Sequence, residues 1–573
     1  MHIRSRRPAR TARTIGAALA ILSAAAAVAA APPPARVTLP GHLPAAALAS
    51  ARGLGRLRPD VPVSLALTLP VRRPDALDDL LGGLSDPNDP RFGQFLSAAQ
   101  FAATFGPTQA DYDAVAAFAR SQGLTVTGTH TNRLVLDVVG PSSAVESAFG
   151  VSLFQYQDAS GHVFHAPDRE PTIPAGLAGR LAGVAGLEDA AVWHAQSRLA
   201  PQSVDPLALP YQTGSGPSGG LQPSDIKTAY QLNGTTATGS GQTLGLFELD
   251  GFKAADIAAY ESQFGLPAVP LQTVLVDGYS GASGSGAGEV TLDIELQIAL
   301  APSATKVVVY EGPNTTTGVI DTYNRIAADN SAKQVSTSWG EAEQYETAST
   351  RTAEQNAFKQ MAAQGQTIYA AAGDSGAYDY RRTKPAVDDP ASQPYMCGVG
   401  GTSLSTSGAG GAYLKETTWN RGSASAGAGG GGISSVWPLP SYQSGVYSAA
   451  SKGSTAYRNV PDVALDADPY TGYAIYYNGG WVIYGGTSCA APLWAAFTAL
   501  VNEQRQSAGK APLGQANPAV YSIAKVPATY ATDFHDIADG STNLYYPAVT
   551  GYDDATGWGS FNGAGLLSAL TNY

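Results

Sequence analysis

Short apolar strands alternate with helices in the second part of the chain, and this rhythm limits the possible folds more than any other feature of the sequence. The pattern predicts strands over 243–248, 306–310, 334–338 and 367–372, and helices over 254–264, 289–300 and 352–364. Parallel strands need a long crossover, usually a helix, to return the chain to the same edge of the sheet. The alternation therefore predicts an α/β domain with a mostly parallel sheet flanked by helices.

The 573 residues exceed what one hydrophobic core organises, which is about 250–300 residues. Residues 31–200 mix strands (65–69, 134–139) with amphipathic helices (75–84, 111–122, 142–149), which predicts a small α+β domain. Residues 201–220 are rich in Pro, Gly and Ser without hydrophobic periodicity, as expected for an exposed linker open to proteolysis. Residues 221–573 then form the second domain.

The first residues have the pattern of an export signal. Five arginines up to Arg13 precede an apolar run over 15–30 and the tetrapeptide Ala-Pro-Pro-Pro. This predicts a signal peptide over residues 1–30 and a secreted protein. No later stretch has the length of a membrane span.

Charge narrows the range of partners. Only 14 % of the residues are charged and the formal net charge is −12, so nucleic acid and anionic membranes are not expected as partners. We expect protein or peptide partners and a monomer. The two cysteines, Cys397 and Cys489, are compatible with a disulfide or with two buried thiols.

The sharpest local signal is Gly-Gly-Thr-Ser-Cys-Ala-Ala-Pro over residues 485–492. It follows a strand-like run and opens a long apolar helix, with Pro492 expected in the first turn. Free N–H groups at a helix start favour developing negative charge, so Ser488 is a candidate nucleophile. An ordinary helix-capping serine is the alternative.

A nucleophilic serine needs a base, and the histidines offer little choice. Six of the seven histidines precede the linker, which leaves only His535 in the domain of Ser488. His535 is expected in an aspartate-rich surface loop, which disfavours a Ser-His-Asp triad.

Carboxylates offer another base. Glu289 and Asp293 are spaced i, i+4 and share one face of the predicted helix, opposite an inward-packing set of Val290, Ile294, Ile298 and Ala301. Two adjacent carboxyls share a proton and accept another only while partly ionised, which places activity in acid. A water-facing acidic helix start is the alternative.

Asp374 follows a strand of small residues in Ala-Ala-Gly-Asp-Ser-Gly, at the sheet edge where sites form in parallel folds. A buried, protonated carboxyl there can donate to an oxyanion, whereas a simple turn aspartate is the alternative. The glycine run over 427–432 is expected to be a flexible loop. It lacks the Gly-Lys-Ser/Thr ending of a phosphate-binding loop.

In order along the chain, Glu-x-x-x-Asp (289–293), Gly-Asp-Ser-Gly (373–376) and Gly-Thr-Ser-x-x-x-Pro (486–492) resemble the sedolisin (kumamolisin-like) family of serine-carboxyl peptidases. The resemblance continues through Pro-Asp-Val-Ala (461–464) and Ser-Thr-Ser-Trp-Gly (336–340). Residues 92–96 and 145–149 resemble the family's activation prodomain. The resemblance covers nearly the whole chain after the signal peptide and implies a subtilisin-like fold with glutamate in place of histidine.

The resemblance also implies roles. Ser488 would be the nucleophile of an acid-acting secreted endopeptidase, Glu289 its general base, Asp293 the partner that tunes Glu289, and Asp374 the oxyanion donor. Glu248 and Trp339 match positions that extend the acid network. The precursor would process itself, with its own propeptide as inhibitor.

The stretches around residues 536 and 551–553 resemble the C-terminal calcium site of this family. The resemblance implies that one structural Ca2+ is bound by the side-chain oxygens of Asp536 and Asp553. It also implies ligation by the backbone carbonyl oxygens of Ile537, Val549 and Gly551. Val549 stands where glycine is more usual in the family, and a carbonyl ligand survives that change. A solvated acidic loop is the alternative.

Two other functions remain open from the sequence. One is a neutral subtilisin-like peptidase that uses His535, and the other is an inactive, calcium-stabilised binding protein on the same fold. The complete set of Glu289, Asp293, Asp374 and Ser488 opposes the inactive form.

Overall fold

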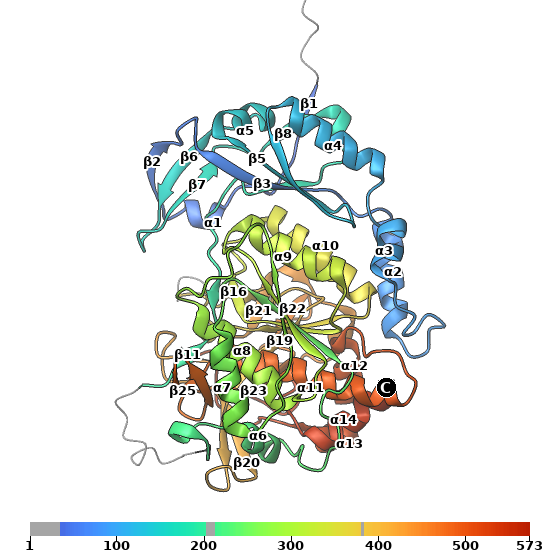
Figure 1. The fold of residues 1–573 in the computed structure, drawn as a ribbon, viewed down its shortest axis with the longest axis vertical. Coiled ribbons are helices and arrows are strands. Elements are labelled where there is room, and N and C mark those ends of the chain that lie inside the picture. Colours follow the sequence, from blue (N-terminus) through green and yellow to red (C-terminus); the bar gives the residue numbers. More distant parts are fainter. Residues whose placement is uncertain (1–34, 202–212, 380–382) are drawn as a thin grey trace, which may run out of the picture. The chain divides into compact units, whose positions relative to one another are not determined.

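The computed structural model describes residues 35–201, 213–379 and 383–573 (Figure 1). The expected signal peptide over 1–30 and most of the expected linker, residues 202–212, lie outside the described residues. In the described part of the chain, no helix combines the length and the apolar character needed to cross a bilayer.

The predicted parallel sheet is present in the second domain (Figure 1). In spatial order its main path is β13 (Leu271–Leu275), β14 (Lys306–Glu311), β12 (Thr243–Glu248), β15 (Gln334–Thr337), β17 (Thr367–Ala371), β19 (Cys397–Thr406) and β20 (Tyr413–Thr418). All neighbours in this path pair in parallel except β19 and β20, and β23 (Val463–Asp466) adds a further parallel partner to β19. The predicted α/β architecture is therefore confirmed.

Helices cover both faces of this sheet because successive strand residues point to opposite sides. Leu244 and Leu246 of β12 join a core with α8 (Ala287–Leu300) and α11 (Thr487–Ser507). Phe247 of the same strand belongs to a second core, which contains α9 (Thr316–Asp329) and α10 (Ala348–Ala363). Each layer of helices thus has its own apolar core.

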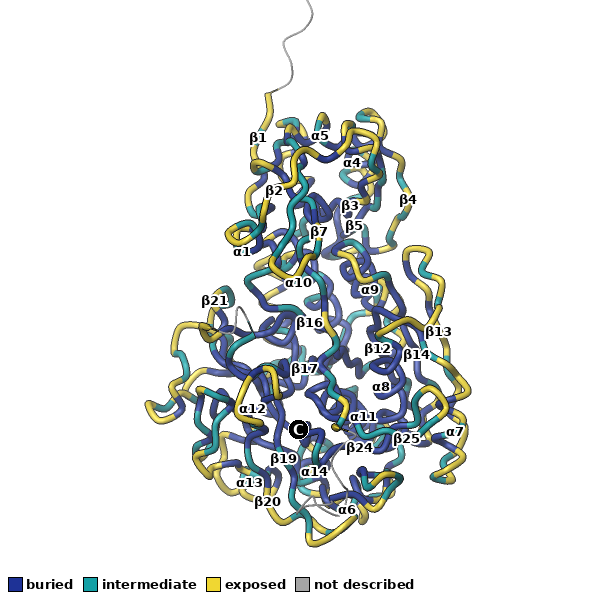
Figure 2. Tube along the Cα trace, turned by 90° about the vertical axis from the view of Figure 1, so that its left-hand side faces the viewer, coloured by how far each residue is buried: buried dark blue, intermediate teal, exposed yellow. Residues whose placement is uncertain are grey.

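Helix α8 differs from the expected amphipathic helix. All of its residues are buried, including Glu289 and Asp293, so it has no face toward water (Figure 2). The helix packs against α11, α7 (Ala254–Phe264) and β24 (Tyr473–Tyr477), which together enclose the acidic side as well as the apolar side. The reading of a water-facing acidic helix start is therefore wrong.

The first domain is the predicted α+β unit. Its antiparallel sheet has the order β4 (Thr125–Thr129), β5 (Val135–Pro141), β3 (Pro62–Thr68) and β9 (Gly183–Ala185). Besides the short α1 (Ala45–Leu48), its helices are α2 (Pro74–Ser85), α3 (Ala98–Thr104), α4 (Gln109–Ser121) and α5 (Ser142–Phe149). Ala66 and Leu134 share a core with Ile320 of α9 and Ala353 of α10, so the two domains meet along these helices.

The glycine run over 427–432 is not the expected flexible loop, because most of it is buried against the end of β17. The N–H of Gly430 donates to the carbonyl of Gly373 at 2.7 Å. A Cβ at position 430 would lie 1.8 Å from the carbonyl oxygen of Ala372. The glycines thus permit two backbone segments to touch beside Asp374.

Helix α9 and strand β19 were not anticipated. The first begins with β-branched Thr residues and the second is interrupted by glycines, and neither composition favours the structure that forms. Both cysteines are buried free thiols, which decides against the disulfide.

Candidate active site

Ser488 lies in the first turn of α11, which is capped by Gly486 and not by the serine itself. Gly486 has a φ of 105°, and a Cβ there would lie 2.3 Å from the carbonyl oxygen of Gln196. The backbone N–H of Ser488 donates to that same oxygen at 2.9 Å. The glycine therefore lets a passing carbonyl reach the free N–H groups of the helix start.

Pro492 lies inside α11, beyond the first turn where it was expected. Since proline has no N–H, the carbonyl of Ser488 loses its usual helical donor. The hydroxyl of Ser338 lies 3.4 Å from that carbonyl and donates to Oδ1 of Asp293 at 2.9 Å. Ser338, at the end of β15, thus connects the serine backbone to the acid pair.

The expected carboxyls converge behind Ser488. Glu289 and Asp293 come from α8 and Glu248 from the end of β12, and all three are buried. The indole Nε1 of Trp339 donates to Oε2 of Glu248 at 2.9 Å. The structure therefore brings both residues of the expected supporting network next to the acid pair.

Burial controls how these acids titrate. Loss of water raises the pKa of Glu289 to about 8, against the opposing effect of the hydroxyls of Ser197, Ser488 and Ser338. The pKa of Asp293 is well above its usual range because of burial and the nearby charges of Glu248 and Glu289. Among the described residues, no donor completes a hydrogen bond to either oxygen of Glu289, and the hydroxyl of Ser488 donates to the carbonyl of Ser338 at 3.5 Å.

Asp374 lies three residues beyond β17, beside the start of α11. Its Oδ1 accepts the backbone N–H of Thr487 at 2.8 Å and the hydroxyl of Thr487 at 3.1 Å. Burial raises its pKa to about 7, although Thr487 and the charge of Arg198 act in the opposite direction. The Nε of Arg198 lies 3.5 Å from Oδ2, the other carboxyl oxygen.

A segment from the end of the first domain occupies this site. β10 (His194–Ala195) pairs antiparallel with β16 (Trp339–Ala342), and β11 (Arg198–Leu199) pairs antiparallel with β25 (Gly480–Gly485). Between them the N–H of Gln196 donates to the carbonyl of Ser338 at 3.0 Å. The chain therefore crosses Ser488 in an extended form, paired on both sides, as a bound peptide would be.

The side chain of Gln196 lies in its own buried position, where its Nε2 donates to Oδ2 of Asp388 at 2.9 Å. Sequence reasoning did not single out Gln196, Arg198, Ser338 or Thr487. The hydroxyl-rich end of β15 was the only sequence signal for Ser338, and the position of Thr487 directly before Ser488 was the only signal for Thr487. Gln196 and Arg198 gave no signal, because they are far from Ser488 in the sequence.

His535 is not the expected surface-loop residue. It belongs to β26 (Phe534–His535), which pairs with β27 (Ser560–Phe561), and its ring stacks on Tyr413 with centroids 3.7 Å apart. Burial lowers its pKa to about 4. It has no recorded contact with Ser488 in the described chain.

The two aspartates of the expected calcium site each hold a neighbouring turn. Asp536 accepts the N–H of Gly551 at 3.2 Å, and Asp553 accepts the N–H of Val549 at 2.8 Å. Within the described residues, the carbonyls of Ile537, Val549 and Gly551 accept no hydrogen bond. Two carboxylates with three free carbonyls fit the oxygen ligands that Ca2+ prefers.

Comparison with known proteins covers both domains. Residues 49–190 match the family model of the pro-kumamolisin activation domain, and residues 286–559 match that of the subtilase family. Kumamolisin of Bacillus sp. (strain MN-32) is 36 % identical over 492 residues, which are 83 % of this chain and 86 % of that protein. Tripeptidyl-peptidase 1 of Rattus norvegicus is 27 % identical over 556 residues, 91 % of this chain and 93 % of that protein.

Sedolisin of Pseudomonas sp. (strain 101) is 31 % identical over 529 residues, 88 % of this chain and 86 % of that protein. The solved structure of Pseudomonas sedolisin, complexed with two molecules of pseudo-iodotyrostatin, aligns with a TM-score of 0.55 at 30 % identity. That alignment covers 62 % of this chain and 98 % of the solved chain.

Proposed function

This chain belongs to the sedolisin and kumamolisin family of serine-carboxyl peptidases and has their activation domain, and from that premise we propose that it is an acid-acting, secreted endopeptidase that processes its own precursor. The observation that carries the proposal is the N–H of Ser488 donating to the carbonyl oxygen of Gln196. A serine peptidase makes this contact with the carbonyl that it attacks.

The proposed reaction uses each carboxyl in a different protonation state. Oγ of Ser488 adds to the carbonyl carbon while its proton passes to ionised Glu289. Protonated Asp374 and the N–H of Ser488 hold the resulting oxyanion. Collapse breaks the C–N bond, and the proton on Glu289 leaves with the amine. Water then hydrolyses the acyl-enzyme by the same transfer through Glu289.

Asp293 and Glu248 are proposed to tune this base. Three buried carboxyls in contact cannot all ionise. At any time, therefore, most of them carry a proton and few carry a negative charge. Because the proton can move along the set, a minor fraction of molecules keeps Glu289 ionised below its pKa of about 8, and that fraction carries the proposed reaction. Trp339 and Ser338 support the arrangement, because each donates a hydrogen bond to one of the acids.

We place the self-processing bond between Gln196 and Ser197, close to the expected end of the propeptide domain at residue 200. The pairing of β10 and β11 on either side of Ser488 supports this position. It also explains how the propeptide inhibits, because the segment fills the cleft that a substrate would enter.

The same segment favours endopeptidase over tripeptidyl-peptidase activity. A tripeptidyl-peptidase binds a free amino terminus three residues before the scissile bond. Here the chain continues without a break on the amino-terminal side of His194, back to residue 35. The cleft therefore accommodates a longer peptide on that side.

The test is cleavage of a protein substrate across pH after acid incubation of the purified full-length chain. We expect activity confined to acid, with Ser488→Ala and Glu289→Gln inactive and uncut, and His535→Ala nearly unaffected. An optimum near neutrality that disappears in His535→Ala would contradict the mechanism. Processed but inactive protein at every pH would indicate a binding protein instead.

Two further readouts separate the finer proposals. Mass spectrometry of the first processing product should find a new amino terminus at Ser197. Peptides with an acetylated amino terminus should be cut as well as free ones, because an endopeptidase does not need the amine. Cleavage of the free peptides alone, with release of tripeptides, would refute endopeptidase activity.

We also propose that one structural Ca2+ binds at Asp536, Ile537, Val549, Gly551 and Asp553. The ion would neutralise two carboxylates and join the turns that they hold. Secretion is proposed from the amino-terminal signal pattern alone.

A further inference from the structure

Four ionisable side chains meet where the first domain lies against the peptidase domain, far from the active site along the chain. His130 lies in the turn before β5, and Asp137 lies within that strand. Asp321 comes from α9, and Asp277 follows β13. We call His130, Asp137, Asp277 and Asp321 the interdomain cluster.

The atoms of this cluster lie close enough to share one partner. Nε2 of His130 is 2.8 Å from Oδ2 of Asp137 and 3.6 Å from Oδ1 of Asp321. One ligand atom from each of these three residues lies within 4.8 Å of the others. Two ligand atoms bonded to one ion at about 2.0–2.2 Å lie about 3.3–3.6 Å apart, so an ion would replace the 2.8 Å contact between His130 and Asp137 and draw the more distant atoms together.

Asp321 is the second, independent sign of a missing partner. Its side chain is 1 % exposed, and its Oδ1, which faces His130, accepts no hydrogen bond within the described chain. Such a buried carboxylate oxygen without a donor costs free energy unless something neutralises it.

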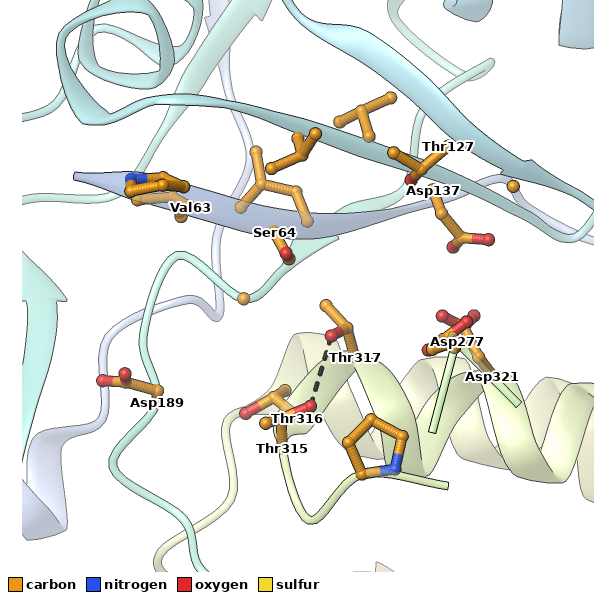
Figure 3. Close-up of a pocket in the computed structure, with 18 of the residues that line it drawn as sticks. Val63, Ser64, Thr127, Asp137, Asp189, Asp277, Thr315, Thr316, Thr317 and Asp321 are labelled. Carbon is orange, nitrogen blue, oxygen red and sulfur yellow. Dashed lines mark hydrogen bonds between the residues drawn. The ribbon is translucent and has the colours of Figure 1, made fainter. Parts of the chain in front are cut away.

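The cluster borders a cavity of about 650 Å³, and none of the described residues that line it is lysine or arginine. The described lining of this adjacent cavity contains one histidine, His165, and it is paired with Asp189 at 2.9 Å. Figure 3 shows Asp137 extending from the first-domain strand toward Asp277 and Asp321, which lie next to each other across the cavity. Glu188 and Asp189 line the same cavity, where Asp189 is paired with His165 and burial raises the pKa of Glu188 to about 7.

The backbone makes room for the carboxylates. Gly128 lies opposite Asp137 at an irregular point in the pairing of β4 and β5, and a Cβ there would lie 2.1 Å from Oδ2 of Asp137. Asp277 adopts a left-handed conformation with a φ of 51°. The strained aspartate and the glycine position acids in a place where burial alone would disfavour them.

A second acidic cluster in the peptidase domain, Glu346, Glu354 and Asp389, is different. Nε2 of Gln393 donates to Glu354 and to Asp389, and the positive charge of Arg351 lies nearby. Both oxygens of Glu346 lack a donor among the described residues, but Arg351 supplies that cluster with a compensating charge from the protein itself.

We propose that the interdomain cluster binds one divalent cation of the Zn2+ or Mn2+ type, which joins the activation domain to the peptidase domain in the precursor. An imidazole nitrogen with carboxylate oxygens is a ligand set that suits these borderline ions. Because the ligands come from both domains, the ion would hold the propeptide in place.

The experiment is calorimetric titration of the full-length precursor, kept uncut by Ser488→Ala, with ZnCl2 or MnCl2. Saturating Ca2+ is present throughout, so that the proposed calcium loop does not contribute. We expect one equivalent to bind. Asp321→Asn should weaken binding by at least about tenfold, since even loss of an outer partner costs that much. Asp329→Asn, on the same helix but partly exposed, is the matched control and should leave binding unchanged.

A second measurement addresses folding. Zn2+ or Mn2+ should raise the Tm of the uncut precursor, and His130→Gln, a change in a turn, should abolish the rise. No binding of either ion would overturn the proposal, as would equal binding in the Asp321→Asn and Asp329→Asn proteins. In both cases the cluster would hold protons only. None of these readouts depends on peptidase activity, so their failure would leave the proposed function standing.

Discussion

Arg198 is expected to slow self-processing through its charge on Asp374, although it belongs to the segment that is cut. Its Nε lies 3.5 Å from Oδ2 of Asp374, and its Nη2 donates to the backbone carbonyl of the same residue at 3.1 Å. A positive charge at this distance favours the ionised carboxyl. The proposed oxyanion donor must be protonated, so Arg198 lowers the pH up to which Asp374 can act.

The size of the effect follows from Coulomb's law. Two unit charges 3.5 Å apart interact by about 5 kcal/mol at an effective dielectric constant of about 20. The guanidinium charge is delocalised, and the arginine side chain is 27 % exposed, so water screens part of this energy. Arginines beside aspartates typically lower the pKa by about 1–3, and we take the lower end, about 1.

Arg198→Gln removes the charge and raises the pKa of Asp374 above its present value of about 7. Asp374 then keeps its proton to higher pH, and its pKa moves closer to that of Glu289, which is about 8. Above both pKa values, the fraction of molecules with Asp374 protonated and Glu289 ionised therefore increases by about tenfold when the pKa of Asp374 rises by one, whereas well below pH 7 it does not change, because Asp374 is already protonated there.

The assay is first-order self-processing of the purified precursor, followed by gel densitometry from acidic to neutral pH. Arg198→Gln should process at an unchanged rate in acid and about tenfold faster on the alkaline side of the rate profile, so that the alkaline midpoint rises by about one pH unit. Arg198→Lys, which keeps a positive charge, is the matched control and should resemble the unmodified chain. An unchanged or lowered midpoint in Arg198→Gln would refute the electrostatic argument.

Three more predictions concern the network, the core and the calcium loop. Ser338→Ala removes the donor to Asp293 at 2.9 Å and should lower kcat by about tenfold at unchanged KM, the effect of one hydrogen bond of about 1.4 kcal/mol; a change in KM alone would indicate a binding role. Asp462→Asn leaves fully buried Arg458 without its charged partner and should lower the free energy of unfolding of the Ser488→Ala precursor, measured in urea, by about 3–5 kcal/mol. Asp329→Asn breaks a partly exposed pair and should lower it by less than about 1 kcal/mol. Equal losses would contradict the argument. Calcium at 100 times its Kd should stabilise the protein by about 2.7 kcal/mol, read as a higher Tm than in chelator, and Asp553→Asn should remove the difference; a persistent difference would place the ion elsewhere.

Much of the fold could be predicted because its signals are local. The alternation of β12, α7, α8 and β14 follows from short-range hydrophobic patterns, and the predicted bounds of β12 and α7 agree with the structure. The spacing of Glu289 and Asp293 places both on one side of a helix whatever surrounds it. The sequence did not reveal that the apolar side and the acidic side of α8 are both buried, because burial depends on which elements pack around the helix.

The candidate site also combines residues that sequence motifs identify with contacts that only the structure shows. Ser488, Asp374 and the acid pair each lie in a short motif, so the sequence alone was enough to single them out. Their relation to Gln196, Arg198 and Ser338 depends on the first-domain segment pairing with β16 and β25, and such pairing joins strands that are far apart in the chain. The interdomain cluster likewise brings together residues from a turn, two strand regions and a helix. The sequence by itself determined the kinds of chemical group and the local elements that hold them, whereas the tertiary structure alone decided which groups meet, because contacts between distant segments are set by packing and not by spacing.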